Sequence, residues 1–459
     1  MPELTTVHST YVNNVRLIHF VCWMAGEFKY SEVQSFYQDE VIFITGATGF
    51  LGKALLEKLL RSCPGIRRIY ILIRPKKNAS PTGRLEVLLK SECFKRLHKE
   101  YPESLNKVVG VEGNLTDEKL GLKSSDYKSL ASEVSVVFHC AATVRFNDTL
   151  RNAVKINMEG TKSVLELCHN MKNMKAVVHV STAFVNCDHE TLDERLYPPM
   201  VKPDDIIALT KKMDEVDLVK LTPELLGAKP NTYIFTKHLA EWIVAEHGQR
   251  LPLVIVRPSI VSASWREPVT GWLDGLQGVN LLVASGVTGV VTTIVADKSA
   301  VMDIIPVDVV ANALIIAACQ ATLRGRTSQA QSRQDLPVYN CTSGAINKIT
   351  YGEIAVLTTK LGRKHTPETN FCRPGMDMTM SPFYQAVAVF LFNYLPALFF
   401  DLVQPRRKQN MRMVDILKKY QYFFFTTRFF TTRNWKFNSE KFIELHTHNT
   451  PLDRKVNCI

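Results

Sequence analysis

A tyrosine and a lysine four positions apart, Tyr233 and Lys237, have a spacing that suggests chemistry. On a helix, side chains four apart lie on one face, one turn from each other. An ammonium beside a phenol stabilises the phenolate and lowers the tyrosine pKa, so that the phenol can pass a proton near neutral pH. The lysine can also reach the ribose of a bound nucleotide. The alternative interpretation is an ordinary helix surface.

Two hydroxyl side chains, Ser181 and Thr182, follow a predicted strand at residues 175–180. Ligands of parallel sheets bind at the carboxyl ends of the strands. A hydroxyl placed there can donate a hydrogen bond to a substrate carbonyl oxygen and stabilise the charge that grows as a hydride arrives. The hydroxyl pair therefore favours the catalytic interpretation of Tyr233 and Lys237.

Three glycines, Gly46, Gly49 and Gly52, join a short apolar strand at residues 40–45 to a helix at residues 53–62. The first allows a sharp turn, the second lets the backbone approach a pyrophosphate, and the third lets helix and strand pack closely. The helix N-terminus then offers unpaired N–H groups to the phosphates. This arrangement predicts a dinucleotide site.

The end of the second predicted strand, residues 68–74, indicates which dinucleotide binds. Arg74 ends this strand, Lys76 and Lys77 follow it, and Arg84 comes ten residues after Arg74. No acidic residue stands there to bind a ribose 2′-hydroxyl, and cations suit a 2′-phosphate, so the prediction is NADPH. The alternative is a solvated basic turn.

Apolar strands alternate with helices over much of the chain, which predicts a parallel sheet with both faces covered. We expect an α/β, doubly wound Rossmann domain over residues 38–345. Residues 1–37 are an extension of unknown role, and their apolar stretch at residues 17–24 lacks the basic lead and cleavage site of a secretory signal. The main domain should then face the cytosol. The remaining strands are expected at residues 107–112, 133–139 and 252–257, and the long helices at residues 150–171 and 233–247.

The composition is that of a globular protein, since 46% of the 459 residues are hydrophobic and 22% are charged. Disordered, collagen-like and polytopic membrane proteins are excluded. The net charge of +12 is concentrated in residues 401–459, which hold 12 basic and 5 acidic side chains. That distribution favours a local basic patch, and no nucleic-acid partner is expected. The ten cysteines contain no CxxC pair, which predicts free thiols and no metal site.

Residues 383–403 form a 21-residue apolar stretch without lysine or arginine. Its only clearly polar members are Gln385, Asn393 and Asp401. About 20 apolar residues span a bilayer core, but Asn393, Pro396 and Asp401 weaken a spanning helix. A membrane span or re-entrant insertion, an interfacial helix and a buried core helix all stay open. The basic residues 406–408 that follow suit the cytosolic face of an anionic membrane.

Several longer motifs resemble one family. The run TGATGFLG, Tyr233 with Lys237, and the hydroxyl pair are similar to extended short-chain dehydrogenases. The more specific motifs resemble alcohol-forming fatty acyl-CoA reductases of the insect type, with their male-sterility C-terminal domain, over residues 31–445. These motifs are TGATGFLG (45–52), HCAATVRF (139–146), VHVSTAF (178–184), RPSIV (257–261), PVDVV (306–310) and FTTRNWKF (430–437).

The resemblance implies a smaller, mainly helical C-terminal domain at residues 346–445 and a divergent tail at residues 446–459. It also implies reduction of a long-chain fatty acyl-CoA by NADPH to a primary alcohol, through an aldehyde. The enzyme would be membrane-associated, on peroxisomes or the endoplasmic reticulum, with the catalytic domain facing the cytosol. Whether the chain forms a homo-oligomer is left open.

The resemblance also assigns residues to roles. Thr182 matches the catalytic hydroxyl, with Ser181 a lesser candidate, Tyr233 the proton donor, and Lys237 its partner, which also binds the cofactor. The other positions expected to bind the cofactor are Gly46, Thr48, Gly49, Phe50, Leu51 and Gly52 at the phosphates, Arg74 and Arg84 at the 2′-phosphate, Asn114 and Leu115 at the adenine, Ala141 and Ala142 beside the dinucleotide, and Pro258 and Ser259 near the nicotinamide.

The chain departs from the family pattern at a few positions. Asn114 replaces an aspartate, and Phe184 replaces a tyrosine. The segment FFTTR at residues 424–428 is repeated at residues 429–433. Three rival functions stay open: a hydroxysteroid-type or other alcohol dehydrogenase, which would share the first domain, a non-catalytic NADPH-binding sensor, and a membrane-tethered scaffold. The aromatic and basic C-terminal segment argues against the first, and the retained Tyr233 and Lys237 argue against the second.

Overall fold

The structure is a computed structural model, and it describes residues 31–76, 80–247, 250–325, 336–365, 372–403, 412–447 and Asp453. The apolar stretch at residues 17–24, Lys77, the basic residues 406–408 and all of the tail after residue 447 except Asp453 lie outside the described residues.

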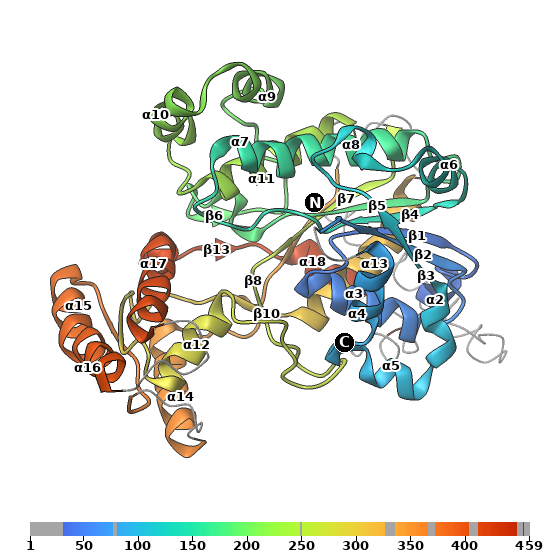
Figure 1. Cartoon of the computed structure of the whole chain (residues 1–459). Coiled ribbons are helices and arrows are strands. Elements are labelled where there is room, and N and C mark those ends of the chain that lie inside the picture. Colours follow the sequence, from blue (N-terminus) through green and yellow to red (C-terminus); the bar gives the residue numbers. More distant parts are fainter. Residues whose placement is uncertain are drawn as a thin grey trace, which may run out of the picture.

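A seven-stranded parallel sheet forms the centre of the molecule (Figure 1). The order is β11-β7-β5-β4-β1-β2-β3, and each neighbouring pair is parallel. The chain order reverses between β1 and β4, where open sheets of this kind bind ligands. The predicted doubly wound fold is confirmed. The strands are β1 (Val41–Thr45), β2 (Arg68–Ile73), β3 (Val108–Glu112), β4 (Val136–His139), β5 (Ala176–Val180), β7 (Leu253–Pro258) and β11 (Val338–Cys341).

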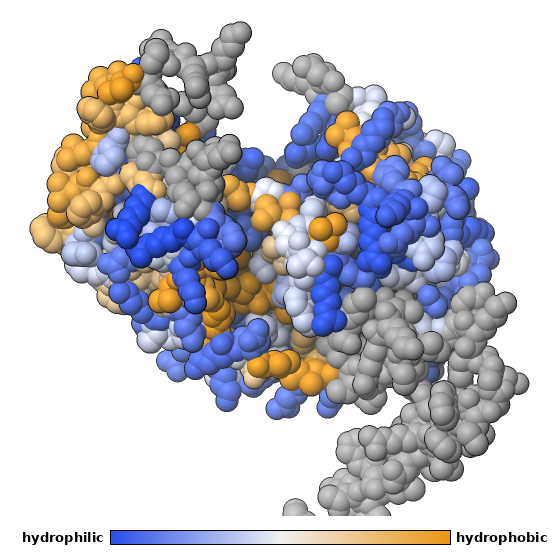
Figure 2. Space-filling model, turned by 90° about the horizontal axis from the view of Figure 1, so that it is seen from below, coloured by the Kyte–Doolittle hydropathy of each residue, from blue (hydrophilic) through white to orange (hydrophobic). Residues whose placement is uncertain are grey.

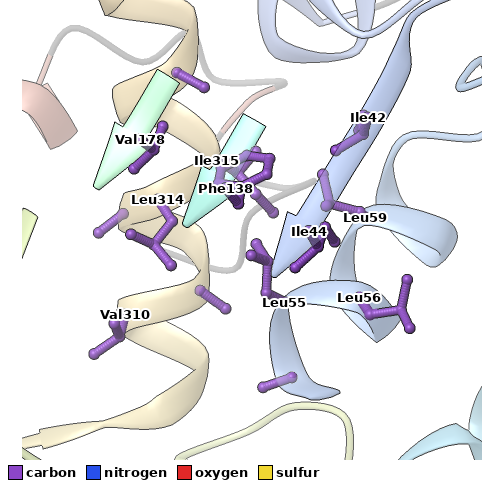
Figure 3. Packing of buried hydrophobic residues seen from close by; sticks show 14 of the residues in the cluster. Ile42, Ile44, Leu55, Leu56, Leu59, Phe138, Val178, Val310, Leu314 and Ile315 are labelled. Carbon is purple, nitrogen blue, oxygen red and sulfur yellow. The ribbon is translucent and has the colours of Figure 1, made fainter. Parts of the chain in front are cut away.

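Helices cover both faces of this sheet because its strands are apolar on both sides. On one face, Ile42 and Ile44 of β1 pack against Leu55 of α3 (Phe50–Ser62) and Leu314 of α13 (Val307–Gly325) (Figure 3). On the other face, Val41 and Phe43 pack in a second core. This core includes residues of α8 (Gly160–His169) and α11 (Thr232–His247).

The predicted helix at residues 150–171 contains an irregularity. It begins as α7 (Leu150–Ala153), passes through a π-helical turn, η4 (Val154–Glu159), and continues as α8. A π turn widens the helix by one residue and frequently marks a functional site.

Residues 31–37, which lie before the predicted boundary at residue 38, pack against the sheet domain. Ser31 caps α2 (Glu32–Phe36) in a capping box with Gln34. Tyr37 is fully buried, and its hydroxyl donates a 2.9 Å hydrogen bond to the Ile315 carbonyl of α13. Residues 31–37 thus belong to the sheet domain.

A second, mainly helical unit is built from two separate parts of the chain. Residues before the predicted boundary at 346 contribute α12 (Val279–Thr288) and β9 (Thr293–Val295). Strand β9 pairs in parallel with β12 (Asp377–Thr379). The unit has its own apolar core, in which Leu282, Ile294, Tyr351, Met378 and Leu417 meet. Its other helices are α14 (Tyr351–Lys364), α15 (Pro382–Val389), α16 (Leu395–Val403) and α17 (Met413–Thr431).

The end of the chain returns to the sheet domain. Strand β13 (Lys436–Phe437) pairs with β6 (Thr191–Leu192), and the backbone N–H groups of Lys441 and Phe442 in α18 (Glu440–Thr447) donate to the Glu194 carboxylate. The remaining elements are α4 (Pro81–Leu89), α5 (Lys95–Glu100), α6 (Ser124–Glu133), α9 (Pro203–Lys212), α10 (Glu215–Leu226), β8 (Ile260–Ser262) and β10 (Ile304–Pro306).

Candidate active site

The turn between β1 and α3 has the geometry of a phosphate-binding loop. Gly46 has a φ of +78°, and a Cβ there would lie 2.7 Å from the backbone nitrogen of Ala141. A Cβ on Gly52 would lie 2.2 Å from the carbonyl oxygen of Gly46. Gly49 is the N-cap of α3 and has no side chain to cap it, so the first N–H groups of the helix remain available to an anion. The loop therefore fits a dinucleotide pyrophosphate.

The other residues of this loop lie as their positions predict. Thr48 is part-buried in the turn, and Leu51 packs against the first core. The Phe50 ring lies 5.3 Å from the Trp272 ring, so its contribution to anion binding would come from its backbone N–H. The dinucleotide-binding role of the whole turn agrees with its position at the reversal of strand order.

The two arginines predicted to bind a 2′-phosphate are brought together. Arg74 follows β2 directly and is exposed. Helix α4 carries Arg84 back to this point, where its Nη1 donates a hydrogen bond to the Arg74 carbonyl oxygen. Two guanidinium groups at the end of β2 suit a phosphate ester on the adenosine ribose.

The predicted adenine-binding residues make mostly local contacts. The Asn114 amide donates to Thr116 Oγ1 at 2.5 Å and to Asp117 Oδ1 at 3.0 Å. Its backbone N–H donates to the Leu120 carbonyl at 2.7 Å. Leu115 is buried against Gly160. In this structure Asn114 holds a tight turn after β3, and its contact with adenine stays a prediction.

Two further predicted segments follow neighbouring strands at the same edge. Ala141 and Ala142 come after β4, and the Ala141 N–H donates to Thr45 Oγ1 at 3.3 Å. Pro258 ends β7, and the N–H of buried Ser259 donates to the Cys341 carbonyl at 3.1 Å. Both segments therefore lie at the carboxyl edge of the sheet, where the prediction requires them.

The structure brings Thr182 and Tyr233 together. Burial raises the pKa of Tyr233 to about 12, and a hydrogen bond with the Thr182 hydroxyl offsets part of that rise. Thr182 Oγ1 also accepts the Phe184 N–H at 3.3 Å, which fixes the hydroxyl at the end of β5. At neutral pH the phenol is therefore protonated and can donate.

The lysine lies one turn further along α11, but it does not act on the phenol as the spacing predicted. Lys237 Nζ donates to the Val180 carbonyl at 2.6 Å and lies 3.3 Å from His179 Nε2. Burial lowers the Lys237 pKa to about 8. The predicted lowering of the tyrosine pKa is wrong for this structure, because desolvation of the phenol outweighs the interactions that favour phenolate.

Two buried histidines lie behind the lysine, and the sequence interpretation did not assign them a role. The His139 and His179 rings are 5.3 Å apart. His139 Nδ1 lies 2.7 Å from Thr45 Oγ1, and its Nε2 lies 3.0 Å from Thr161 Oγ1. Burial, with the nearby Lys237 charge, lowers the pKa of His139 to about 3 and that of His179 well below its usual value. Both imidazoles are therefore neutral, and Lys237 carries the positive charge of this region.

A buried ion pair connects α11 to β7. Arg257 contacts the Glu241 carboxylate with two hydrogen bonds, at 2.8 Å and 2.7 Å, and both side chains are fully buried. Burial alone would raise the Glu241 pKa, but Arg257 outweighs it and the pKa is lowered. Ser181 also lies against Glu241, whereas Thr182 lies against Tyr233. Thr182 is therefore the better candidate for the catalytic hydroxyl.

Asn157, in the π turn, is a further site residue that the sequence did not reveal. Its Oδ1 accepts the Thr143 N–H at 2.9 Å, and its Nδ2 donates to Thr236 Oγ1 at 3.0 Å. It therefore links the loop after β4 to the residue beside Lys237. Asn157 is one of several polar residues in this helix, among them Asn152 and Lys155, so nothing in the sequence could have singled it out.

Aromatic rings connect the site to the C-terminal unit. The Phe146 ring stacks on Tyr233 with centroids 5.8 Å apart, and Phe430 at the end of α17 lies 5.6 Å from Phe146. Phe184, at the position where a tyrosine was expected, lies 5.5 Å from Phe430 and 5.6 Å from Trp435. The repeated FFTTR segment thus supplies an aromatic ring near the proposed proton donor.

Comparison with protein families and with curated proteins agrees with this geometry. Two models described as "Male sterility protein" match, the NAD-binding one over residues 44–314 and the second, Sterile, over residues 392–458. The chain is 36% identical to fatty acyl-CoA reductase 1 of Xenopus laevis over 92% of its length and 81% of that protein. The chain belongs to the fatty acyl-CoA reductase family.

Other relatives give the same result. Fatty acyl-CoA reductase 1 of Homo sapiens is 36% identical over 92% of this chain and 81% of its own. Fatty acyl-CoA reductase 2 of Bos taurus is 33% identical over 93% and 81%. Family membership and the NAD-binding model place the chain among nicotinamide-dinucleotide oxidoreductases.

Solved structures resemble the fold at low sequence identity. The terminal R domain of a myxalamid biosynthetic pathway has a TM-score of 0.57 at 19% identity, over 92% of this chain and 89% of that one. The reductase domain of a non-ribosomal peptide synthetase from Mycobacterium tuberculosis has a TM-score of 0.56 at 16% identity, with the same coverage. These likenesses show that the family shares the architecture of reductase domains.

Proposed function

We propose that this chain reduces long-chain fatty acyl-CoA with NADPH to a primary alcohol through an aldehyde, releasing coenzyme A. The observation that carries the proposal is the meeting of Thr182 and Tyr233 at the carboxyl edge of the sheet, beside the phosphate-binding turn. Membership of the fatty acyl-CoA reductase family supports the substrate class.

The residues at the sheet edge suit NADPH. The Gly46 turn and the N-terminus of α3 would hold the pyrophosphate, because the N-cap Gly49 has no side chain to cap the first N–H groups of the helix. Arg74 and Arg84 would bind the 2′-phosphate and favour NADPH over NADH. The bound cofactor supplies a hydride to the substrate carbonyl carbon.

The chain itself supplies oxygen-binding groups and a proton. The Thr182 and Tyr233 hydroxyls would hold the thioester carbonyl oxygen and stabilise the negative charge that develops on it. Since burial keeps the Tyr233 phenol protonated at neutral pH, it can donate the proton that the alkoxide needs when the aldehyde becomes an alcohol. Lys237, which is charged at neutral pH, would contribute a positive charge near the cofactor ribose.

We also propose that the chain is membrane-associated, with the catalytic domain in the cytosol, on peroxisomes or the endoplasmic reticulum. Among the described residues, one helix, Pro382–Val403, is long and apolar enough to cross a membrane, with a mean hydropathy of 1.9. This supports contact with lipid, and the long apolar substrate gives a reason for it.

Purified protein supplied with palmitoyl-CoA and NADPH tests the reaction. We expect two NADPH oxidised for each coenzyme A released, with hexadecanol as the product detected by mass. A ratio of one would mean that the reaction stops at the aldehyde. Turnover of sterols but not acyl-CoA would favour an alcohol dehydrogenase. NADPH binding without turnover of either substrate would favour a sensor or scaffold.

A further inference from the structure

The helix at residues 382–403 exposes most of its apolar side chains. It is continuous, because α15 joins α16 through a π-helical turn, η8 (Phe390–Tyr394). Of its most apolar window, only 22% is buried. The predicted alternative of a buried core helix is therefore wrong. The large exposed apolar residues are Phe383, Tyr384, Val387, Phe390, Leu391, Phe392, Leu395, Leu398, Phe399, Phe400, Leu402 and Val403, which we call the apolar face.

A single stripe of the helix contacts the protein. Five of its residues recur every four positions, at Gln385, Val389, Asn393, Ala397 and Asp401. Ala388, Tyr394 and Pro396 lie next to them, and all eight are buried or part-buried. On a straight α-helix of 3.6 residues per turn, a four-residue spacing would wind around the axis. The π turn takes up the extra residue and keeps Asn393 and the residues after it on the protein side.

The three clearly polar residues of this helix, Gln385, Asn393 and Asp401, all lie on this stripe. The Gln385 amide donates to Gln421 Oε1 at 3.1 Å. Fully buried Asn393 accepts the Thr292 hydroxyl at 3.1 Å, and the Asp401 carboxylate accepts the Met413 N–H at 2.8 Å. All three side chains thus make contacts on the protein side of the helix, so the apolar face is free of them.

These same contacts argue against a transmembrane orientation. The helix is tied to α17 at both ends, through Asp401 with Met413 and through Gln385 with Gln421. Between these two points α17 exposes Asp415, Lys418 and Lys419. A spanning helix would carry these charges into the hydrocarbon layer, which is costly. A helix lying parallel to the membrane plane leaves them at its surface.

The chemistry of the apolar face favours lipid over a protein partner. Among the residues of the apolar face, Tyr384 alone has a side-chain group that can form a hydrogen bond. Protein interfaces typically have about one hydrogen bond per 100–200 Å², so this face is poorly suited to a protein partner. Figure 2 shows apolar residues gathered over this unit, with hydrophilic residues beside them. On α17, exposed Tyr422 and Phe425 follow Lys418 at helical spacing, so that apolar and basic groups share one face. Anionic headgroups suit such a combination.

We propose that the helix at residues 382–403 lies flat in the surface of an anionic phospholipid bilayer, with the apolar face inserted at the boundary of headgroups and acyl chains. This deepens the membrane association proposed above and rests on it. Helix α17 packs along the inserted helix and carries Phe430 in its last turn, where the ring lies beside Phe146, which stacks on Tyr233. The membrane contact is thereby joined by one helix to the site that receives the acyl group.

Flotation of the full chain with vesicles of phosphatidylcholine and phosphatidylserine tests the apolar face. Phe383, Phe399 and Leu402 are 79%, 69% and 84% exposed, and changing all three to serine should weaken binding at least tenfold. A matched control changes Val87, Met200 and Val216, which are 73%, 103% and 65% exposed on the other unit, and it should bind like the unchanged chain. Equal vesicle binding by both variants would overturn the proposal. A serine variant that still binds vesicles but no longer self-associates would also overturn it, because the apolar face would then join copies of the chain.

The depth of single introduced tryptophans in the bilayer tests the orientation of the helix. Phe383→Trp, Phe392→Trp and Phe399→Trp each place an indole on the apolar face, and lipids brominated at different depths quench it. Insertion in the plane predicts the same shallow depth for all three. A span predicts Phe392→Trp near the bilayer centre and the other two near its surfaces, which would overturn the proposal.

Turnover of palmitoyl-CoA without vesicles separates this inference from the proposed activity. The serine variant should retain it, which also shows that the variant folds. Loss of vesicle binding in the unchanged chain with retained turnover would refute the membrane contact alone. Absence of turnover with intact vesicle binding would refute the proposed reaction alone.

Discussion

Lys237 Nζ donates a 2.6 Å hydrogen bond to the carbonyl of Val180, the residue just before Ser181 and Thr182. This bond fixes α11 against the end of β5, and it places Tyr233, one turn earlier on α11, beside the Thr182 hydroxyl. The spacing of tyrosine and lysine therefore sets the position of the phenol as well as supplying a charge.

Tyr233→Phe should reduce kcat for palmitoyl-CoA reduction by about 10²–10⁴-fold, the usual contribution of a general acid. The Phe146 ring can still stack on the new side chain, so the site should keep its shape. NADPH affinity, measured by fluorescence titration, should stay within about twofold because the phenol does not hold the phosphates. Turnover close to that of the unchanged enzyme would show that another group supplies the proton.

Thr182→Ala should reduce kcat by about 10²–10³-fold, as expected when one donor to the developing oxyanion is removed. Thr182→Ser keeps the hydroxyl and serves as the matched control, with kcat close to the original. Ser181→Ala should have a much smaller effect, since Ser181 lies against Glu241. Steady-state kinetics of the three variants would contradict the assignment if Ser181→Ala proved the most damaging.

The rate should fall as the pH rises above about 8. Burial lowers the Lys237 pKa to about 8, so the ammonium is present below that pH and is lost above it. Tyr233, with a pKa of about 12, stays protonated over this range and cannot cause the decline. Because arginine stays charged, Lys237→Arg should retain activity at alkaline pH relative to its own neutral value. A pH profile of kcat/KM that is flat to pH 10 would be inconsistent with this assignment.

Arg74→Ala should raise KM for NADPH by about tenfold or more, because a hydrogen bond to a charged group contributes about 1.5–3 kcal/mol. KM for NADH should change little, since NADH lacks the 2′-phosphate. The control is Lys90→Ala, which removes an exposed basic side chain at the C-terminal end of α4. Equal effects on both cofactors would argue that Arg74 acts on the fold rather than on the phosphate.

Glu241→Gln should lower the free energy of unfolding by about 3–5 kcal/mol, because it leaves Arg257 buried without its charged partner. The control Glu92→Gln disrupts an exposed pair with Lys95 and should cost about 0–1 kcal/mol. The Glu241 pKa is lowered, so the pair stabilises the fold above the unfolded carboxyl pKa of about 4.3 and less as the pH falls below it. Chemical denaturation at pH 7 and pH 4 measures both effects.

Local patterns were sufficient to predict the parts of the site that lie within one turn or one helix. Spacings of three or four residues separate the glycines at positions 46, 49 and 52 and the pair Tyr233 and Lys237. The alternation of apolar strands with helices likewise predicted the parallel sheet, because each strand must bury both of its faces.

Contacts between distant segments decided the rest. Burial of the phenol, which raises the Tyr233 pKa, depends on neighbours that no local spacing encodes. Asn157 acquires its role when a π turn points it at Thr143 and Thr236. The environment of the helix at residues 382–403 was ambiguous because its polar residues could have faced lipid. They contact Thr292, Met413 and Gln421, which come from other parts of the chain. Hydrophobicity along the chain measures how apolar a segment is, whereas packing determines which of its sides remains uncovered.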